Sequence, residues 1–248
     1  MKPPVTRSAP RFFVPARLSA GAELELPERA AHHCGVLRLR SNDFITLFNG
    51  EGGEYAAELT RISRDVAYAR VISRQAIERE SPLAITLAQC ISSGDRMDVA
   101  LQKSTELGVA RVVPIASARS VVRLSSERAD RRLAHWRNVI IAACEQCGRN
   151  RIPEVAGIVE LEPFLSSASG GEGLRLLLAP GAPRSLKQLE RTTAVTLLIG
   201  PEGGLAPEEQ RRAEISGFVP ISFGGRVLRT ETAPLAAIAA MQAMWGDC

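Results

Sequence analysis

Two different patterns of hydrophobic and polar positions divide the sequence. In residues 11–75, apolar residues occur in short runs or alternate with polar ones, which is typical of β-strands. From residue 84 onward, short apolar runs alternate with longer segments of helical periodicity, which indicates an α/β layer with a mostly parallel sheet. The charged stretch Ser73–Ser81, followed by Pro82, separates the two patterns. We therefore expect two domains, over residues 1–76 and 77–248.

The first pattern predicts several short strands and little helix. Strands are expected at Phe12–Val14, Phe44–Phe48, Tyr55–Leu59 and Val66–Ile72. In the last of these, Ala67, Ala69 and Val71 share one face, as in a strand that buries one side. The turn cluster Asn49–Gly53 is of the kind that joins hairpin strands, and a short helix is expected over about Glu28–Leu37. This many short strands in so short a segment predict a small β-barrel.

The second pattern predicts alternating strands and helices. Strands are expected at Ala84–Ile91, Val112–Ala116, Leu174–Ala179, Val195–Ile199 and Val219–Phe223. Helices are expected at Arg96–Leu107, Glu127–Cys144, Ser185–Glu190, Pro207–Ser216 and Ala233–Met244. The segments Leu174–Leu178 and Val195–Ile199 are almost continuously apolar, as strands covered on both faces should be. The triplet Asp95, Arg96 and Asp98 is most simply the start of a helix, where the helix dipole favours carboxylates.

The composition restricts the class of protein. The chain has 248 residues, of which 45% are hydrophobic and 23% charged, and its longest apolar runs are well short of a membrane span. Residues 1–15 carry charge and proline where a signal peptide has an apolar block. The five cysteines are an odd number at scattered positions, which fits a reducing compartment better than a disulfide framework. We therefore expect a cytoplasmic protein without a membrane partner.

The basic residues are mostly arginine, and they are unevenly distributed. Only three of the 31 basic residues are lysine, and the stretch from Arg111 to Arg137 contains seven arginines against two acidic residues. Guanidinium groups bind phosphate bidentately and stack on bases, so this pattern suits a polyanion such as a nucleic acid. An arginine-rich proteome would produce the same ratio without any such partner.

A first glycine-rich turn, Gly200–Gly204, directly follows a predicted buried strand. Pro207 then opens a helix that carries Glu208 and Glu209 in its first turn. Strand, glycine turn and helix in this order form a common ligand site, because the backbone can approach the ligand closely. The GxGxxG motif of dinucleotide sites is absent, and the acidic first turn disfavours phosphate. The turn therefore favours an adenosyl group held by backbone amides, and the alternative is a plain tight turn.

A second glycine-rich turn, Gly224–Ala233, follows the last predicted strand and leads into the last helix. We expect Thr230 or Thr232 to cap that helix. Arg226, Arg229 and Glu231 concentrate charge beside two apolar elements. They suggest either a polar site or an ion-pair cluster at the start of the helix with little functional meaning.

The remaining cysteine and histidine residues do not form a recognisable metal or hydrolytic site. Cys144 and Cys147 form a CxxC motif without further ligands or a thioredoxin-like context, so we interpret them as small residues that end a helix. His32, His33 and His135 have no partners with the spacing of a zinc site or a catalytic triad, so we expect them to be structural or to face RNA. No metal site is expected.

Short motifs along nearly the whole chain carry a resemblance to one family. In chain order they are PRFFV (Pro10–Val14), AHHCGVLRLR (Ala31–Arg40), FNGEGGEY (Phe48–Tyr55), RESPL (Arg79–Leu83), GDRMD (Gly94–Asp98), QKSTELGV (Gln102–Val109), RSVVR (Arg119–Arg123), CEQCGRNRIP (Cys144–Pro153), GPEGGL (Gly200–Leu205) and RVLRTETAPLAA (Arg226–Ala237). Together they resemble the bacterial 16S ribosomal RNA uridine-N3-methyltransferase family (RsmE-type) of the SPOUT superfamily. The motifs GPEGG and RVLRTETA are the most specific, and ELGV and RESPL narrow the match to this branch.

The resemblance implies a fold and an activity. The expected fold is a PUA-like N-terminal RNA-binding β-barrel and a C-terminal α/β SPOUT domain, in which a parallel sheet is tied in a trefoil knot. The expected reaction transfers a methyl group from S-adenosylmethionine to N3 of a uridine in 16S rRNA, within an assembled or assembling small ribosomal subunit. The expected working form is a homodimer.

The resemblance also assigns residues to roles. Cofactor contacts are expected from three loops, at Leu178, Ala179, Pro180, Gly200, Pro201, Glu202, Gly203, Gly204, Phe223, Gly224, Val227 and Leu228. RNA contacts are expected from Arg11, Arg38, Arg40, Arg119, Arg123 and Arg149. Arg229 is expected to stabilise the uridine anion, and Glu231 to act as the base or to orient Arg229. The alternative is that both residues only pin the knot or the dimer contact.

Two positions depart from the family pattern, and three other readings stay open. Asn42 stands where glycine is common, although asparagine tolerates a left-handed backbone. Phe223 replaces a usual leucine and so alters the expected adenine wall. The alternatives are a SPOUT ribose 2′-O-methyltransferase acting on rRNA or tRNA, a non-catalytic rRNA-binding assembly factor, and an α/β protein with an unrelated ligand.

Overall fold

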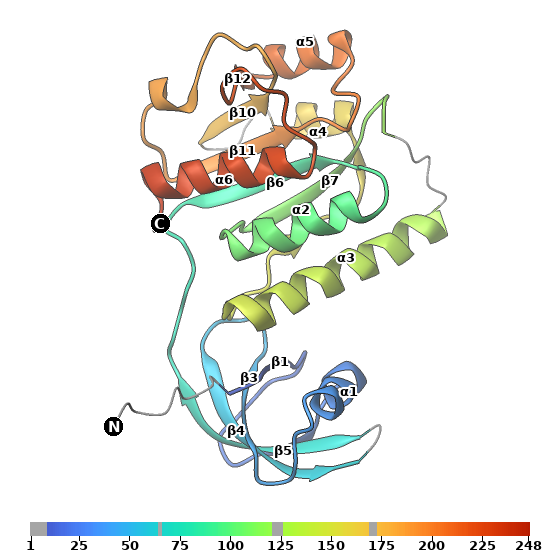
Figure 1. The fold of residues 1–248 in the computed structure, drawn as a ribbon, viewed down its shortest axis with the longest axis vertical. Helices are drawn as coiled ribbons and strands as arrows, with labels where there is room; N and C mark the ends of the chain where they lie inside the picture. The colour runs from blue at the N-terminus through green and yellow to red at the C-terminus, as the bar shows by residue number, and fades with distance from the viewer. Residues whose placement is uncertain (1–8, 64–65, 121–125, 169–172) are drawn as a thin grey trace. The chain divides into compact units, whose positions relative to one another are not determined.

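The computed structural model describes residues 9–63, 66–120, 126–168 and 173–248 (Figure 1). The chain forms two compact units. The first contains Met1–Glu80 together with Cys144–Ile152, and the second contains Ser81–Ala143 and Pro153–Cys248. The first unit thus extends to Glu80 rather than to residue 76. It also includes a segment from the middle of the chain that we had expected in the second domain.

The first unit contains a five-stranded sheet with the strand order β1-β3-β4-β5-β2. Its elements are β1 (Arg11–Phe13), β2 (Glu23–Glu25), α1 (Glu28–Val36), β3 (Phe44–Phe48), β4 (Glu54–Ile62) and β5 (Ala67–Gln75). The strands β1 and β3 are parallel, and the other neighbours are antiparallel. The four predicted strands and the predicted helix are confirmed. The short strand β2 was missed, because two of its three residues are exposed glutamates without an apolar pattern.

The core of this unit lies on one face of the sheet, beneath α1. Ala67, Ala69 and Val71 of β5 are buried while Arg70 between them is exposed, which confirms the predicted alternation. Burying this face supplies most of the stabilisation that the unit can obtain from apolar surface. The same core also includes Phe12, Val14, Leu18, Ala30, Ala31, Cys34, Ile45, Leu47, Ala57 and Leu59.

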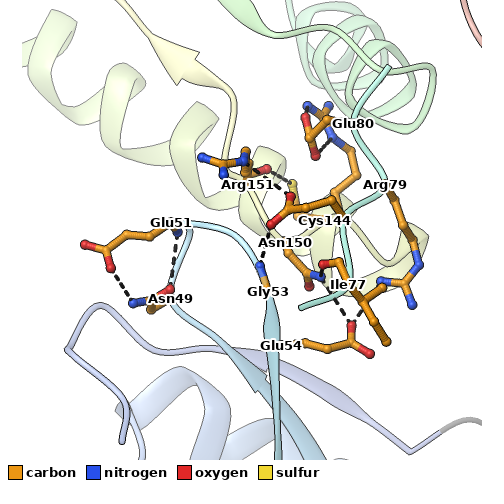
Figure 2. A network of polar contacts seen from close by, with 12 residues as sticks. Asn49, Glu51, Gly53, Glu54, Ile77, Arg79, Glu80, Cys144, Asn150 and Arg151 are labelled. Carbon is orange, nitrogen blue, oxygen red and sulfur yellow. Dashed lines mark hydrogen bonds and ion pairs between the residues drawn. The ribbon is translucent and has the colours of Figure 1, made fainter. Parts of the chain in front are cut away.

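The segment Cys144–Ile152 joins the first unit through a buried polar network (Figure 2). The side-chain amide of Asn150 is fully buried; it donates to the carbonyl oxygen of Ile77 at 2.7 Å and accepts from Arg11 at 2.5 Å. The carboxylate of Glu54 accepts from Arg11 at 2.5 Å and from Arg79 at 3.0 Å. Burial opposes ionisation of Glu54, but its hydrogen bonds with the two arginines prevail and lower its pKa. Removing Arg11 would therefore take a donor from both the buried side-chain oxygen of Asn150 and the Glu54 carboxylate.

Two further ion pairs attach the same segment. Arg149 donates from Nε and Nη2 to both carboxylate oxygens of Glu80, at 3.1 and 2.5 Å, and only 5% of its side chain is exposed. Glu78 pairs with Arg151 at 3.3 Å and accepts from the backbone N–H of Gly53 at 2.6 Å. These pairs hold the residues that follow α3 against the segment that follows β5 in the first unit.

The second unit contains a seven-stranded sheet in the order β12-β10-β11-β6-β7-β8, with β9 also paired to β7. Its strands are β6 (Ala84–Cys90), β7 (Arg111–Ala116), β8 (Glu154–Val155), β9 (Val159–Glu160), β10 (Leu174–Leu178), β11 (Ala194–Ile199) and β12 (Val219–Ile221). Its helices are α2 (Asp95–Glu106), most of α3 (Ser126–Cys147), α4 (Leu161–Ala168), α5 (Pro207–Ile215) and α6 (Thr232–Trp245). Every strand pairing in this sheet is parallel among the described residues. The predicted α/β class with a parallel sheet is confirmed.

Most predicted elements of this unit are present within a residue or two of their expected bounds, and a few differ. The segment predicted as a helix at Ser185–Glu190 forms only a 3₁₀ turn, Leu186–Gln188, because so short a segment does not repay the cost of helix nucleation. The helix α4 was missed, although Pro163 in its first turn is compatible with a helix start. The strands β8 and β9 have two residues each, too few to produce a recognisable pattern.

Helices cover both faces of the parallel sheet. Phe164 of α4 and Phe218 after α5 pack with Leu177 and Leu198 on one face. On the other face, α6 lies in front of the sheet in Figure 1 and packs against α2. This double cover explains why β10 and β11 are almost continuously apolar, with Arg175 and Thr196 as their polar residues. Among the helices that the structure describes, none combines the length and the apolar character that a bilayer span requires.

Three neighbouring strands end at the same level, and this positions the site. Leu178, the last residue of β10, pairs with Ile199 at the end of β11 and with Ile221 at the end of β12. The loops that follow these strands therefore leave from one edge of the sheet. In parallel α/β sheets this carboxyl edge is where ligands bind.

Candidate functional site

A cavity of about 650 Å³ lies at the carboxyl edge of β10, β11 and β12. Its walls come from the loops after these three strands, with additional residues from α2, α5 and α6. The lining residues are Arg96, Leu177, Leu178, Ala179, Pro180, Ile199, Gly200, Pro201, Glu202, Gly203, Gly204, Leu205, Gln210, Phe223, Arg226, Val227, Leu228, Arg229, Thr230, Glu231 and Ala233. This volume is of the size that small-molecule ligands occupy.

The structure brings together almost all residues that the family resemblance assigned to the cofactor. All of them line the cavity except Gly224. The two proposed catalytic residues, Arg229 and Glu231, line the same cavity. Sequence reasoning missed Arg96, which it explained only as part of a helix start. The strand order would have revealed it, because β6 lies next to β11 and the loop after β6 therefore runs beside Gly200–Gly204.

The loop after β11, Gly200–Gly204, is hereafter called the glycine loop. A Cβ atom on Gly200 would lie 3.1 Å from the backbone nitrogen of Leu205 and 3.3 Å from backbone atoms of Gly204, contacts that have little room to relax. Gly204 has a left-handed backbone with φ of 65°. By contrast, a Cβ atom on Gly203 would meet only the side chain of Arg119, at 3.5 Å. Gly200 and Gly204 are therefore needed for the shape of the loop itself.

Thr230 connects the glycine loop to the loop that precedes α6. Its buried hydroxyl donates to the carbonyl of Gly200 at 3.0 Å and accepts from the side-chain amide of Gln89 at 3.2 Å. The expectation that Thr230 or Thr232 caps α6 is wrong, since no side chain caps this helix. Two backbone N–H groups in the first turn instead donate to the carbonyl of Arg229 at 2.9 Å.

Glu202 is the most strongly perturbed carboxylate at the cavity. It accepts from the backbone N–H and the hydroxyl of Ser93, both at 2.8 Å, and pairs with Arg96 at 2.9 Å. Burial opposes its ionisation, but the hydrogen bonds from Ser93, its own backbone and Arg96 outweigh burial and lower its pKa to about 2. Glu202 is therefore a fixed negative charge at neutral pH.

Arg229 and Glu231 have no ion-pair partners within the part of the chain that the structure describes, and the same holds for Arg226. The alternative of a satisfied ion-pair cluster at this turn is therefore wrong for the described residues. Arg229 is exposed at the cavity, and the Oε2 atom of Glu231 is buried without a hydrogen-bond partner. A buried acceptor without a partner is uncommon and suits a site that receives a donor from a ligand.

The arginines assigned to RNA have different surroundings. Arg38 and Arg40 are exposed, and Arg38 has a left-handed backbone with φ of 57°. Arg11 and Arg149 instead turn their guanidinium groups toward Glu54 and Glu80 within the first unit, as described above. Their positive charge is thus used inside the fold, which sequence alone did not anticipate because both glutamates lie far away along the chain.

The other two arginines assigned to RNA are Arg119, which lies near the cavity, and Arg123. Arg119 is exposed and donates to the carbonyl oxygen of Gly203 at 2.8 Å, so it touches the glycine loop. Arg123 lies outside the described residues.

The CxxC motif ends a helix, as predicted. Cys147 is the last residue of α3, and Cys144 is buried with its Sγ atom 3.7 Å from the carbonyl oxygen of Arg151. Burial raises the pKa of the Cys144 thiol to about 12, which keeps it protonated and unreactive at neutral pH. No group of three or more metal-ligating side chains occurs in the described ranges. Of the three histidines, His135 pairs with Asp98 at 2.6 Å.

Comparisons with known proteins match both units. An RNA methyltransferase domain family matches residues 79–242, and an RNA methyltransferase PUA domain family matches residues 26–72. The ribosomal RNA small subunit methyltransferase E of Buchnera aphidicola (subspecies Schizaphis graminum) is 33% identical over 240 residues, which covers 96% of this chain and 97% of that protein. The protein of the same name from Bacillus subtilis is 29% identical and covers 86% and 87% of the two chains.

Two solved structures resemble the chain over nearly its full length. A protein of Legionella pneumophila, solved with S-adenosylmethionine, has a TM-score of 0.94 at 41% identity and covers 98% of this chain and 100% of its own. The ribosomal RNA small subunit methyltransferase E of Neisseria gonorrhoeae, bound to S-adenosylmethionine, has a TM-score of 0.88 at 42% identity. The match covers 96% of this chain and 99% of that structure. The expected PUA-like N-terminal domain and SPOUT-type α/β domain are thus confirmed.

Proposed function

Because the chain belongs to the ribosomal RNA small subunit methyltransferase E family, we propose that it methylates N3 of a uridine in 16S rRNA with S-adenosylmethionine as the methyl donor. Methylation of small-subunit rRNA with this donor is the activity of the family, and the uridine and its N3 atom are the finer part of the proposal. The observation that carries it is the cavity at the carboxyl edge of β10, β11 and β12, where Arg229 and Glu231 lie beside the glycine loop.

The residues of the cavity fit an adenosyl cofactor. Leu178, Phe223 and Leu228 supply apolar walls, and Gly200 keeps side-chain atoms out of a turn whose backbone is tightly folded. The cavity volume of about 650 Å³ suits a ligand of this size. When bound, S-adenosylmethionine supplies an electrophilic methyl group.

The chain's own residues address the difficulty that N3 of uridine carries a proton. This imide proton must leave before or during methyl transfer, and negative charge then spreads over N3 and the neighbouring carbonyl oxygens. Arg229, exposed at the cavity, provides a guanidinium group that stabilises this charge. Glu231, whose buried Oε2 atom lacks a partner, provides an acceptor for the proton.

The base has to leave its stack to reach these groups. Enzymes that modify bases act on single-stranded segments or flip the target nucleotide. The exposed arginines Arg38 and Arg40 of the PUA-like domain provide phosphate contacts that hold the RNA. We place the reaction in the cytoplasm, on 16S rRNA within an assembled or assembling small subunit. A homodimer as the working form and a trefoil knot around the cavity complete the proposal.

The test is mass mapping of modified nucleosides in 16S rRNA from cells with and without the gene. N3-methyluridine at one position should disappear on deletion and return with the wild-type gene, but not with Arg229→Ala. A deletion that removes a ribose 2′-O-methyl group would assign the other SPOUT reaction. A deletion that changes no nucleoside would contradict the proposal and leave the assembly factor and the α/β protein with an unrelated ligand as the alternatives.

A further inference from the structure

We propose that Arg96 and Arg119 are positioning residues that together hold the glycine loop in the shape required for cofactor binding. The two arginines donate hydrogen bonds to adjacent residues of that loop: Arg96 to Glu202, and Arg119 to Gly203. The inference rests on the proposed use of the cavity for S-adenosylmethionine, and it assigns Arg119 a role other than RNA binding.

The first of these contacts is made by Arg96 to the side chain of Glu202. Arg96, in the first turn of α2, donates from Nη1 to the Glu202 carboxylate at 2.9 Å. Ser93, in the loop between β6 and α2, donates its backbone N–H and its hydroxyl to the same oxygen. A single carboxylate oxygen of the glycine loop is thus held by three donors, two from Ser93 in the loop after β6 and one from Arg96 at the start of α2. Charge-assisted hydrogen bonds of this kind are stronger than neutral ones.

The second contact is made by Arg119 to the backbone of the neighbouring residue, Gly203. Arg119, in the loop after β7, donates from Nη1 to the carbonyl oxygen of Gly203 at 2.8 Å. Its aliphatic carbons also lie beside Gly203, close enough that a Cβ atom at this position would be in van der Waals contact with them. The residue before it is anchored as well, because the backbone N–H of Ala118 donates to Oε1 of Glu209 at 2.7 Å. The other oxygen of Glu209 accepts from the backbone N–H of Ala206 at 2.8 Å, two residues after the glycine loop.

The glycine loop needs such support because of its composition. Glycine loses more conformational entropy on ordering than any other residue, and the loop contains Gly200, Gly203 and Gly204. If the loop were ordered only by the ligand, that cost would reduce the binding affinity. The hydrogen bonds from Arg96 and Arg119 order the loop before the ligand binds, so the binding site is already formed.

The experiment measures the loop with and without a ligand. Arg96→Ala, Arg119→Ala and the double variant are compared with wild type, and Arg211→Ala is the control. Arg211 also pairs with a glutamate in the same unit, but it does not line the cavity. Hydrogen exchange of residues 200–206 in the ligand-free protein should accelerate in the test variants alone. Calorimetry without RNA should give an S-adenosylmethionine Kd about tenfold higher for each single variant, the scale of one charge-assisted hydrogen bond.

Conservative variants separate positioning from general damage to the fold. Arg119→Lys retains a donor for one carbonyl oxygen, and Arg96→Lys retains the charge opposite Glu202, so both should recover part of the affinity. Glu202→Gln should weaken binding in the wild-type background and have a smaller effect once Arg96 is alanine, because the ion pair is then already lost and only the contacts with Ser93 remain. Thermal melts check that every variant is folded.

Unchanged loop exchange and unchanged Kd in the folded double variant would overturn the proposal. If Arg119→Ala leaves the Kd unchanged but lowers the salt slope of RNA binding by about one, Arg119 is a phosphate contact instead. Failure of the proposed function is a separate result, because it would appear as wild-type protein that does not bind S-adenosylmethionine at all.

Discussion

The hydroxyl of Thr230 donates a hydrogen bond to the main-chain carbonyl of Gly200 across 3.0 Å, although thirty residues of chain separate them. The contact joins the start of the glycine loop to the turn that carries Arg229 and Glu231. Gln89 of β6 donates to the same hydroxyl, so the link continues into the middle of the sheet. The parts of the cavity proposed for cofactor and for catalysis are therefore fixed relative to each other by one side chain.

We expect Thr230→Val to damage both stability and cofactor binding. Valine has nearly the same shape but removes one of the two acceptors of the buried Gln89 amide and the hydroxyl donor to the Gly200 carbonyl, which should cost about 1–3 kcal/mol in the free energy of unfolding. Thr232→Val is the control, because Thr232 is exposed. Urea unfolding and calorimetry measure the two effects. Equal behaviour of the two variants would mean that the Thr230 hydroxyl does not hold the loops.

Gly200 and Gly203 should respond differently to alanine. In Gly200→Ala, the new methyl group would contact backbone atoms at 3.1–3.3 Å, so the loop must shift and the S-adenosylmethionine Kd should rise at least about tenfold. Gly203→Ala adds a methyl group in ordinary contact with Arg119 and should leave the loop intact. Calorimetry on both proteins compares them directly. A larger loss from Gly203→Ala would show that the ligand itself approaches that residue.

Arg229→Ala should reduce turnover without reducing cofactor affinity. If its guanidinium acts on charge that develops only during the reaction, the single-turnover rate should fall by about 100-fold or more. The cofactor Kd and the melting temperature should change little, because Arg229 has no ion-pair partner in the described structure. Arg229→Lys should recover part of the rate, since it retains the charge but loses the planar fork. A rate that falls only in step with Kd or stability would make Arg229 a scaffold residue.

Glu54 should make the protein sensitive to acid. Its pKa in the folded protein lies below the ordinary value of 4.5, so its contribution to stability is present above that pH and is lost as the pH falls toward the folded value. Glu54→Gln should therefore be less stable than wild type at pH 7, and the difference should shrink below pH 4.5. Urea unfolding across this range is the measurement. The exposed Glu51→Gln is the control, and a constant difference across pH would contradict the ionic role of Glu54.

Arg40 and Arg149 should separate RNA contact from internal pairing. Arg40 is exposed, so Arg40→Ala should lower the salt slope of rRNA binding by about one while leaving stability unchanged. Arg149 is buried against Glu80, so Arg149→Ala should destabilise the fold and leave the slope unchanged. Fluorescence titration at several salt concentrations and thermal melts distinguish the two. The reverse pattern would return Arg149 to the RNA surface.

The sequence predicted the elements of the cavity well, because their signals are local. The apolar runs of β10 and β11 reflect burial on both faces, and the glycines that follow β11 are set by contacts within the loop, as at Gly200. The alternation around Ala69 likewise needs only its neighbours to be recognised. For such features, the residues that determine the local structure lie within about ten positions of one another, so the local sequence is enough to predict them.

What the sequence did not predict depends on strand order and on distant partners. The position of Arg96 beside Glu202 follows from β6 lying next to β11, which no local pattern encodes. The pairing of Arg149 with Glu80 spans 69 residues, and the contact of Asn150 with Glu54 spans 96. The family resemblance assigned Arg11 and Arg149 to RNA, and the sequence offered no correction, because arginines in such pairs look the same in a sequence as arginines that bind phosphate.

A ribosome making this chain releases residues 1–80 well before it adds Asn150. During that interval Glu54 and Arg11 lack the side-chain amide of Asn150, which hydrogen-bonds to both of them in the complete fold. N-terminal domains generally fold first during synthesis. Here the first unit cannot complete its fold until Cys144–Ile152 has been synthesised, and by then Ser81–Ala143 has also been made. A fragment ending at Glu80 is therefore an incomplete domain, and the two units are interleaved in time as well as along the sequence.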